Sequence, residues 1–253
     1  MRVLVVAENT FREAVRDKVL YVLLFFAIVV ILGSRALGWI SVGQDMKIVK
    51  DFSLAAMSVF GALISIFAGT SLLYKEIDKK TLYTIVAQPM HRHEFVLGKY
   101  LGLVALLVLA LGSMTALSAA YMLVLGGKLN LVFFQAALLN FWKLLVVTAL
   151  AVLLSALTSP ILGAIIVFCA YVLGHATGVF LDLPPQFDGS FTKHFFEVIY
   201  YCVPNLDNFN LHSEAANDIP VSLAYTAWAL AYGAAYSAVL LILACMAFEG
   251  KDL

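Results

Sequence analysis

Charged residues are scarce in this chain. Asp, Glu, Lys and Arg make up 13% of the 253 residues, while hydrophobic residues make up 63%. An ordinary globular protein has about 25% charged residues, and a soluble domain of this length could not bury so much apolar surface. The composition therefore excludes a soluble protein and indicates an integral membrane protein. The sixteen basic and sixteen acidic residues cancel, so no basic field suggests nucleic-acid binding.

Cysteine and metal-ligand clusters are also lacking. Two of the three cysteines, Cys169 and Cys245, fall inside apolar runs, which leaves Cys202 without a plausible partner and excludes a disulfide-rich secreted scaffold. His91 and His93 lie two residues apart, with too few Cys or carboxylate partners for a closed zinc site. We therefore expect no metal site on this chain.

Several catalytic patterns are missing. No G-x-x-x-x-G-K-[ST] sequence occurs, so the chain does not hold nucleotide phosphates by itself and no cofactor is expected on it. No Asp or Glu lies in the middle of an apolar run, which argues against a relay of carboxylates for protons or sodium. His175 is the one histidine inside such a run, too few for paired haem ligands. We expect it to be hydrogen-bonded between helices, with a functional role as the alternative.

The apolar runs predict an all-α fold. A hydrocarbon core about 30 Å thick needs roughly 20 helical residues, and the runs do not alternate as barrel strands would. The single transmembrane domain, 1–253, is expected to have six spans, at 19–40, 52–74, 100–125, 136–157, 161–181 and 221–248. Only Thr158-Ser159-Pro160 separates the fourth span from the fifth, which predicts a tight helical hairpin.

The distribution of basic residues predicts the orientation, since Lys and Arg are enriched in cytoplasmic loops. With both termini in the cytoplasm, the inner side receives the larger share, namely Arg2, Arg12, Arg16, Lys18, Lys75, Lys79, Lys80, Arg92, Lys99 and Lys251. The outer side then receives Arg35, Lys47, Lys50, Lys128, Lys143 and Lys193. Asn140, Trp142 and Lys143 are interpreted as anchors at the membrane interface, so that the fourth span could begin as late as Phe141.

Residues 1–18 predict an amphipathic helix. Leu4, Ala7, Phe11 and Val15 share one face of such a helix, while Arg12 and Arg16 lie on the other. We expect this helix to lie along the inner membrane surface, and a solvated leader that orients the first span is the alternative.

The loop at 75–99 is the longest inner connection and the most charged part of the chain. Asp78 is a plausible cap for a short helix, and Pro89 would end that helix. A mixed-charge helix with an apolar edge would suit docking of a soluble partner, whereas a loop that only sets topology is equally compatible. The outer segment 182–220, which contains four prolines, is either re-entrant or an ordered outer loop.

Small residues recur four apart in two spans. Gly61, Ser65 and Gly69 do so in the second span, and Gly174 and Gly178 in the fifth. Small residues at this spacing let helices approach closely. We expect packing within one bundle, with contact between two copies as the alternative.

This layout resembles the permease subunits of ABC-2-type transporters. The resemblance covers most of the chain and is carried by ENTFREAVRDKVLY near the N-terminus, by six spans, by IYYCVPNLDNFNL, and above all by KEIDKKTLYTIVAQPMHRHEFVLGKYLG. In the last segment the positions similar to the family pattern are Glu76, Thr81, Leu82, Pro89, Arg92, Leu97, Gly98 and Lys99.

The resemblance implies a subunit of the plasma (inner) membrane that works as a dimer with a second permease copy or homologue. Separate cytoplasmic ABC ATPase subunits would bind ATP and Mg and drive transport, mostly export. The expected ATPase-coupling residues are Glu76, Asp78, Thr81, Leu82, Ile85, Val86, Pro89, Arg92 and Lys99. The amphipathic helix would act as an elbow helix that contacts the same subunits, with Phe11, Arg12, Val15 and Arg16 as its key residues.

Two other classes of protein remain as alternatives. One is a permease-like scaffold or signalling subunit, coupled to an ATPase but moving no substrate. The other is a membrane carrier or intramembrane enzyme that needs no ATPase. The lack of carboxylates inside the spans argues against the carrier, and the isolation of His175 argues against the enzyme.

Overall fold

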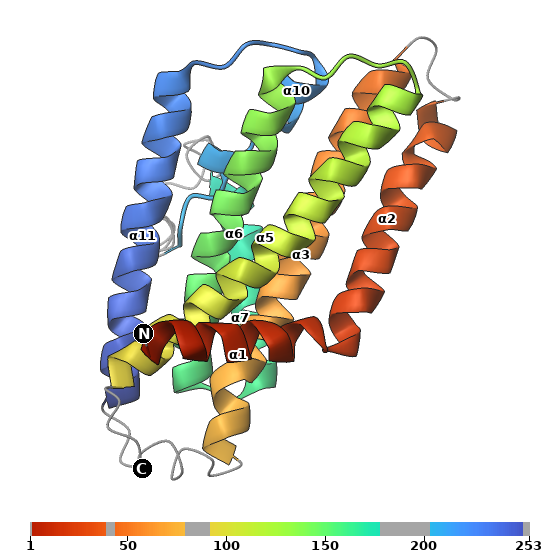
Figure 1. Cartoon of the computed structure of the whole chain (residues 1–253). Coiled ribbons are helices and arrows are strands. Elements are labelled where there is room, and N and C mark those ends of the chain that lie inside the picture. Colours follow the sequence, from red (N-terminus) through yellow and green to blue (C-terminus); the bar gives the residue numbers. More distant parts are fainter. Residues whose placement is uncertain (1, 39–43, 79–91, 178–202, 250–253) are drawn as a thin grey trace, which may run out of the picture.

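The computed structural model describes residues 2–38, 44–78, 92–177 and 203–249. These residues form helices and contain no strand, which confirms the prediction of an all-α fold (Figure 1). The elements are α1 (Arg2–Val15), α2 (Lys18–Gly38), α3 (Asp45–Asp78), α5 (Arg92–Val124), α6 (Leu131–Leu157), α7 (Pro160–His175), the 3-10 turn η2 (Asp207–Phe209), α10 (His212–Ala216) and α11 (Leu223–Glu249).

Five helices in the described ranges are long and apolar enough to cross a membrane, namely α2, α3, α5, α6 and α11. The remaining expected span, 161–181, corresponds to α7, which has 16 residues where a crossing requires about 20. Residues 178–181 lie outside the described part of the chain. The sixth span therefore stays a prediction.

The hairpin predicted around Thr158-Ser159-Pro160 is confirmed. Helix α6 ends at Leu157, and Thr158 leaves the helix with extended backbone while its hydroxyl donates to the Leu154 carbonyl at 2.9 Å. Pro160 then opens α7, at the position where its missing N–H costs no hydrogen bond.

Three of the spanning helices begin earlier than the apolar runs suggested. Helix α3 begins at Asp45, α5 at Arg92 and α6 at Leu131, so the predicted starts at 52, 100 and 136 were wrong. The apolar run sets only the part of a helix that can lie in lipid. The helix itself continues through polar residues until a cap or turn ends it.

Helices α3 and α6 form the centre of the bundle. Helix α3 packs against α2, α5 and α6, and α6 also packs against α11. A Cβ added at Gly69 would lie 2.6 Å from the Ala151 Cβ, and one at Gly61 would overlap the Leu144 side chain. The small residues of the second span therefore serve packing within one chain, as expected.

The outer faces of the bundle are apolar. Phe25 of α2, Ile161 of α7 and Trp228 of α11 are 61%, 77% and 72% exposed. Apolar surface on this scale is typical of contact with lipid. The chain is a multi-pass membrane protein.

Helix α1 runs crosswise to the long helices, near the end of the bundle where the chain passes from α6 to α7 (Figure 1). We call this the α1 end and the opposite end the α10 end. At the α10 end, the chain from Val203 to Ala216 packs back into the bundle against α3 and α6, with Leu206 and Phe209 each 1% exposed. This part of the predicted outer segment is ordered. Residues 182–202 lie outside the described ranges.

Candidate functional site

The predicted coupling residues lie at the α1 end, where α3 finishes and α5 begins. Glu76 and Asp78 belong to the last turn of α3, and Arg92 is the first residue of α5. Five further coupling residues lie in the segment 79–91, outside the described part of the chain, namely Thr81, Leu82, Ile85, Val86 and Pro89.

Lys99 lies deeper than its place in a charged loop suggested. Its side chain is 2% exposed, two turns into α5, and its ammonium lies 5.4 Å from the centroid of the Phe95 ring. Phe95 in turn stacks on Phe248 of α11, with ring centroids 6.0 Å apart. Lys99 therefore occupies the packed junction between α5 and α11.

The predicted elbow residues divide between two faces of α1. Phe11 and Val15 are half-buried, whereas Arg12 is exposed and forms an ion pair with Glu8. Arg16 follows the helix in an exposed turn. Leu4, expected on the apolar face, is 67% exposed. The face of α1 that contacts the bundle contains Phe11 and Val15, as expected, together with Val6 and Thr10.

That contact depends on Gly98, expected only as part of the family pattern, and on Gly102, which the sequence did not single out. A Cβ at Gly98 would lie 2.7 Å from the Val6 Cβ, and a Cβ at Gly102 would lie 2.6 Å from both the Ala7 carbonyl oxygen and the Thr10 Cβ. The two glycines form a G-x-x-x-G pair on α5, and α1 lies directly on it. The motif is visible in the sequence, but it straddles the predicted start of the third span.

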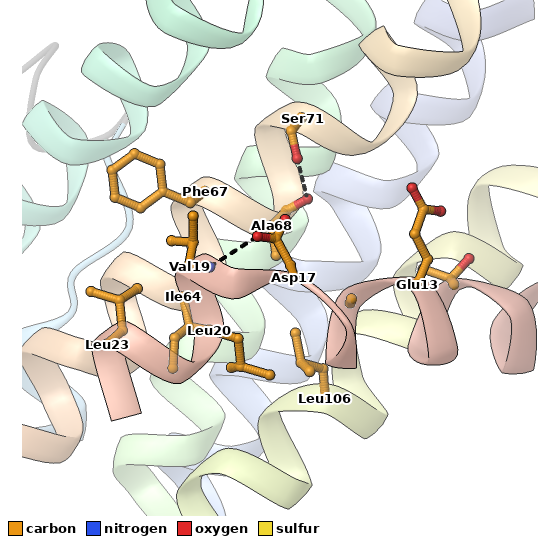
Figure 2. Close-up of a pocket in the computed structure, with 12 residues that line it drawn as sticks. Glu13, Asp17, Val19, Leu20, Leu23, Ile64, Phe67, Ala68, Ser71 and Leu106 are labelled. Carbon is orange, nitrogen blue, oxygen red and sulfur yellow. Dashed lines mark hydrogen bonds between the residues drawn. The ribbon is translucent and has the colours of Figure 1, made fainter. Parts of the chain in front are cut away.

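A cavity of about 200 Å³ opens where α1 turns into α2 (Figure 2). Its lining is mostly apolar and includes the acidic residues Glu13 and Asp17. The Asp17 carboxylate accepts a hydrogen bond of 3.0 Å from the Val19 backbone N–H and so caps the start of α2. The cavity lies between the predicted elbow and the spanning helices.

A polar cluster is buried in the bundle at the end of α7. Lys143 of α6 is 1% exposed, and its ammonium donates to the Ser58 hydroxyl at 2.6 Å. The Lys143 Nζ also lies 3.2 Å from the His175 Nε2, and the Tyr171 hydroxyl lies 2.7 Å from the Ser58 Oγ. Residues from α3, α6 and α7 thus meet in one network.

The hydrogen bonds fix the state of His175. Its Nδ1 lies 2.8 Å from the Tyr171 carbonyl oxygen, which can only accept, so Nδ1 carries the proton. The Nε2 of a neutral ring is then free to accept from Lys143. The expectation that His175 is hydrogen-bonded between helices is confirmed.

The interpretation of Asn140 and Lys143 as interfacial anchors is wrong. Both are 1% exposed, and they lie nine and twelve residues after the start of α6 at Leu131. Because α6 starts earlier than expected, Asn140 and Lys143 lie in the middle of the helix and not near its first residue. A lysine inside an apolar helix indicates a candidate functional site, and this signal was present in the sequence at Lys143.

The chain before α11 covers this cluster. The Leu206 backbone N–H donates to the Gly174 carbonyl at 3.0 Å, and the Thr177 hydroxyl donates to the Asn205 side chain at 2.8 Å. His212 follows on α10. Burial, with smaller electrostatic effects of Lys143 and His175, lowers its pKa to about 4. His212 is therefore neutral at physiological pH.

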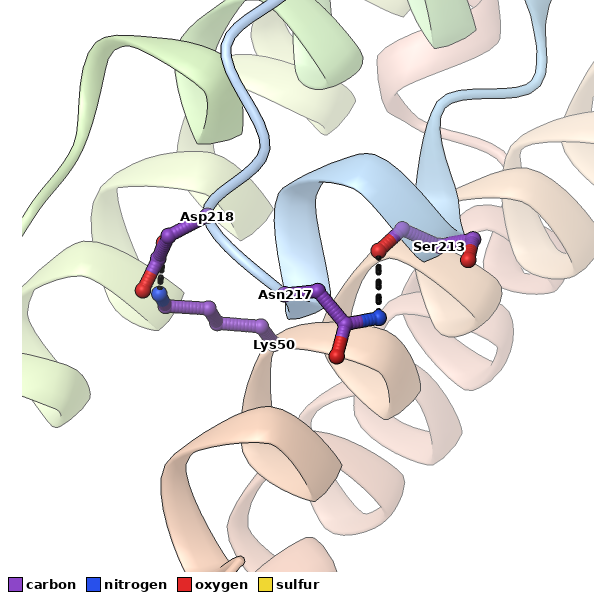
Figure 3. Close-up of polar contacts among 4 residues, drawn as sticks. All are labelled: Lys50, Ser213, Asn217 and Asp218. Atoms are coloured by element: carbon purple, nitrogen blue, oxygen red, sulfur yellow. Dashed lines mark hydrogen bonds and ion pairs between the residues drawn. The ribbon is translucent and has the colours of Figure 1, made fainter.

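At the α10 end, an ion pair fixes the same covering segment to α3. The Asp218 carboxylate accepts from the Lys50 ammonium, and the neighbouring Asn217 side chain donates to the Ser213 carbonyl at 2.9 Å (Figure 3). Partial burial acts to raise the pKa of Asp218. Hydrogen bonds from Lys50 and Asn130 and the charges of Lys50 and Lys47 outweigh this effect, so the pKa lies below its ordinary value.

Comparison with protein families identifies the chain. The model of the ABC-2 family transporter protein matches residues 4–253, nearly the whole chain. The chain belongs to this family, and it is a membrane component of ABC transport that is not itself catalytic. No curated protein matched it.

Proposed function

We propose that this chain is the membrane-spanning permease subunit of an ABC-2-type exporter. It forms the translocation path as a dimer, and separate cytoplasmic ATPase subunits drive it. The observation that carries the proposal is the family match over residues 4–253. The lack of a phosphate-binding loop in the sequence agrees with it, because ATP and Mg then belong to the partner subunit.

The arrangement at the α1 end supports coupling at this place. The connection 79–91 joins the last turn of α3 to the first turn of α5, and α5 carries the glycines on which α1 packs. A partner that moves this connection would act on α5 and, through the close contact at Gly98 and Gly102, on α1. On this ground we assign the elbow role to α1. We further propose that the chain lies in the plasma (inner) membrane with both termini in the cytoplasm.

The side chains that we expect to meet the ATPase are acidic and apolar. Glu76 and Asp78 would pair with basic groups of the partner, and Leu82, Ile85 and Val86 would seat in its groove. Pro89 would fix the angle between the two turns of the connection. Arg12 and Arg16 of α1 would contact the same partner.

Purification from the native membrane in mild detergent tests the proposal. We expect a soluble protein with a phosphate-binding loop to accompany the chain in stoichiometric amount. Isolation of the chain alone, with no effect of ATP, would contradict the proposal. A complex that hydrolyses ATP but responds to no substrate would indicate the scaffold or signalling alternative.

A charge reversal tests the coupling residues. The double variant Glu76→Lys and Asp78→Lys should uncouple ATP hydrolysis from transport while the bundle stays folded. Asp45→Lys is the matched control, since Asp45 is an exposed acidic residue at the other end of α3. Full transport by the double variant would show that the coupling assignment is wrong.

A further inference from the structure

Lys143 is a buried cation whose hydrogen-bonding partners are neutral. Its ammonium carries three donors, and the structure gives acceptors for two of them, the Ser58 hydroxyl and the His175 Nε2. The ion pairs Arg12–Glu8 and Lys50–Asp218 do not include it. A lysine buried inside a membrane bundle is costly, and its presence marks a candidate functional site.

The surroundings of Lys143 make this cation tolerable without neutralising it. The negative end of the α7 dipole lies at His175, beside the ammonium. The face of the Tyr171 ring makes a cation–π contact with the ammonium, with the Lys143 Nζ 6.0 Å from the ring centroid. These dipoles hold the charge in place, yet none of them carries a negative charge of its own.

Further polar atoms near the cluster lack partners. The Ser53 Oγ, the Asn140 Oδ1 and the His212 Nε2 are buried and make no hydrogen bond among the described residues. They belong to α3, α6 and α10, which pack against one another at this place. The Asn140 side chain is held there, because its Nδ2 donates to the Leu54 carbonyl at 3.1 Å. Asn140 lies one helical turn before Lys143 on α6, and the charge of Lys143 acts on His212. Buried polar atoms are normally paired, so these unpaired groups point to a ligand.

The covering segment supplies one negative charge nearby. Asp207, the first residue of η2, acts electrostatically on both Lys143 and His175 without forming an ion pair with either. The segment is held by the Leu206–Gly174 hydrogen bond and by the Tyr232 hydroxyl, which accepts from the Asn205 backbone N–H at 3.0 Å. The negative charge of Asp207 therefore favours the ammonium form of Lys143 while the segment covers the cluster.

We propose that Lys143, held by the His175 Nε2, together with Ser58 and Tyr171, binds the acidic group, a carboxylate or phosphate, of the molecule that this permease moves. Residues 203–212 cover this site from the α10 end, and Asp207 stands in for the ligand's charge when the cover is closed. Transport of the bound molecule rests on the proposed function, whereas binding of an acid at this site does not. The hydroxyl groups of Ser58 and Tyr171 and the ammonium of Lys143 are all donors suited to an anion.

Trp142 offers a direct readout, since it precedes Lys143 in the chain. We would purify the full chain in nanodiscs of uncharged phosphatidylcholine, with Trp39→Phe and Trp228→Phe leaving Trp142 as the only tryptophan. The probes are inorganic phosphate, octanoate, octyl phosphate, octyltrimethylammonium and octanol. We expect saturable fluorescence changes with the acidic probes and none with the cationic or neutral ones. Saturation by inorganic phosphate would indicate a soluble anion, and a response to the octyl acids alone would indicate an acidic amphiphile.

Variants decide whether Lys143 is responsible. Lys143→Met should weaken binding of the acidic probes by about tenfold or more, because a charged hydrogen bond contributes about 1.5–3 kcal/mol. Lys143→Arg should restore most of it. Lys128→Met, which removes an exposed lysine at the α10 end, should leave binding unchanged. Ser58→Ala should weaken binding several-fold, and it keeps the test decisive if Lys143→Met does not fold.

The outcomes separate this inference from the proposed function. Equal responses to acidic and neutral probes, or equal binding by Lys143→Met and the parent chain, would overturn the anion site. The ATPase partner could still copurify in that case, and the permease assignment would stand. If no ATPase copurifies but the acids bind through Lys143, the permease assignment fails while the anion site stands.

Discussion

The Asp218 carboxylate accepts a hydrogen bond from the Lys50 ammonium across 168 residues of sequence. This ion pair joins the chain between α10 and α11 to the start of α3. Its two members differ in burial, since the Lys50 side chain is 5% exposed and that of Asp218 is 44% exposed. Asp218 also has a φ of 57°, in the left-handed region that Asp and Asn tolerate better than most residues.

The difference in burial predicts an asymmetry between two variants. Asp218→Ala leaves a buried ammonium without its acceptor and places alanine in a left-handed conformation, so we expect a loss of about 1–3 kcal/mol. Lys50→Met leaves only an exposed carboxylate and should cost less. Thermal unfolding in detergent measures both, and Asp218→Asn, which keeps an acceptor and tolerates the same backbone, should fall between the parent and Asp218→Ala. An equal or larger loss for Lys50→Met would contradict this account.

Much of the fold could be predicted from the sequence, because uninterrupted apolar runs of about 20 residues are typical of membrane-spanning helices. The break before Pro160 was predicted correctly because proline removes a backbone donor and is favoured at a helix start. The starts of α3, α5 and α6 were not predicted, because hydropathy reports where a helix can contact lipid and not where it begins. The error at α6 placed Lys143 at the membrane interface, whereas the structure places it in the buried centre of the bundle.

The candidate sites were predicted unevenly. His175 was expected to be hydrogen-bonded between helices, but its partner Lys143 could not be named, because the meeting of α3, α6 and α7 depends on packing between distant segments. The cover formed by residues 203–212 was equally hidden, since it lies in the segment 182–220, whose four prolines interrupt any periodicity that would indicate which face is buried. The contact of α1 with Gly98 and Gly102 was missed for a simpler reason. A glycine pair is recognised as a packing motif only within a segment already taken as a helix.

Acid should loosen the covering segment. His212 has a folded-state pKa of about 4, below the ordinary value of about 6.5, so it remains neutral when folded while the released residue takes up a proton. The folded state is therefore not penalised by His212 above about pH 6.5. As pH falls from about 6.5 towards 4, protonation of the released His212 lowers the free energy of unfolding. The lowered pKa of Asp218 adds a loss at still lower pH, below its ordinary range.

The midpoint of thermal unfolding, followed between pH 7.5 and 4.5, measures this effect. We expect it to fall across that range in the parent chain and to fall less in His212→Gln, which cannot take up the proton. Lys143 and His175 are the charged and titratable groups that act on His212. A parallel pH dependence in the parent and in His212→Gln would show that His212 is not the cause.

Gly102→Leu should separate α1 from α5. A side chain there would meet the Ala7 carbonyl oxygen and Thr10, and overfilling a packed contact costs about 1–3 kcal/mol. Hydrogen exchange of the α1 backbone amides, followed by mass spectrometry, should then accelerate. Gly112→Leu is the matched control on the same helix, because no atom lies within 4 Å of a Cβ built at Gly112. Unchanged exchange in Gly102→Leu would mean that the contact does not hold α1.

Trp142 should couple α6 to α11 through Gly233. The indole N–H donates to the Leu230 carbonyl at 2.9 Å, and a Cβ at Gly233 would lie 2.5 Å from the Trp142 Cδ1 and 3.0 Å from the Phe209 Cζ. Gly233→Ala should therefore destabilise the bundle by about 1–3 kcal/mol. Trp142→Ala removes the ring that the new methyl group would meet. In this background Gly233→Ala should cost clearly less, and a double-mutant cycle by thermal unfolding measures the difference. Additive losses would show that the two residues do not share this contact.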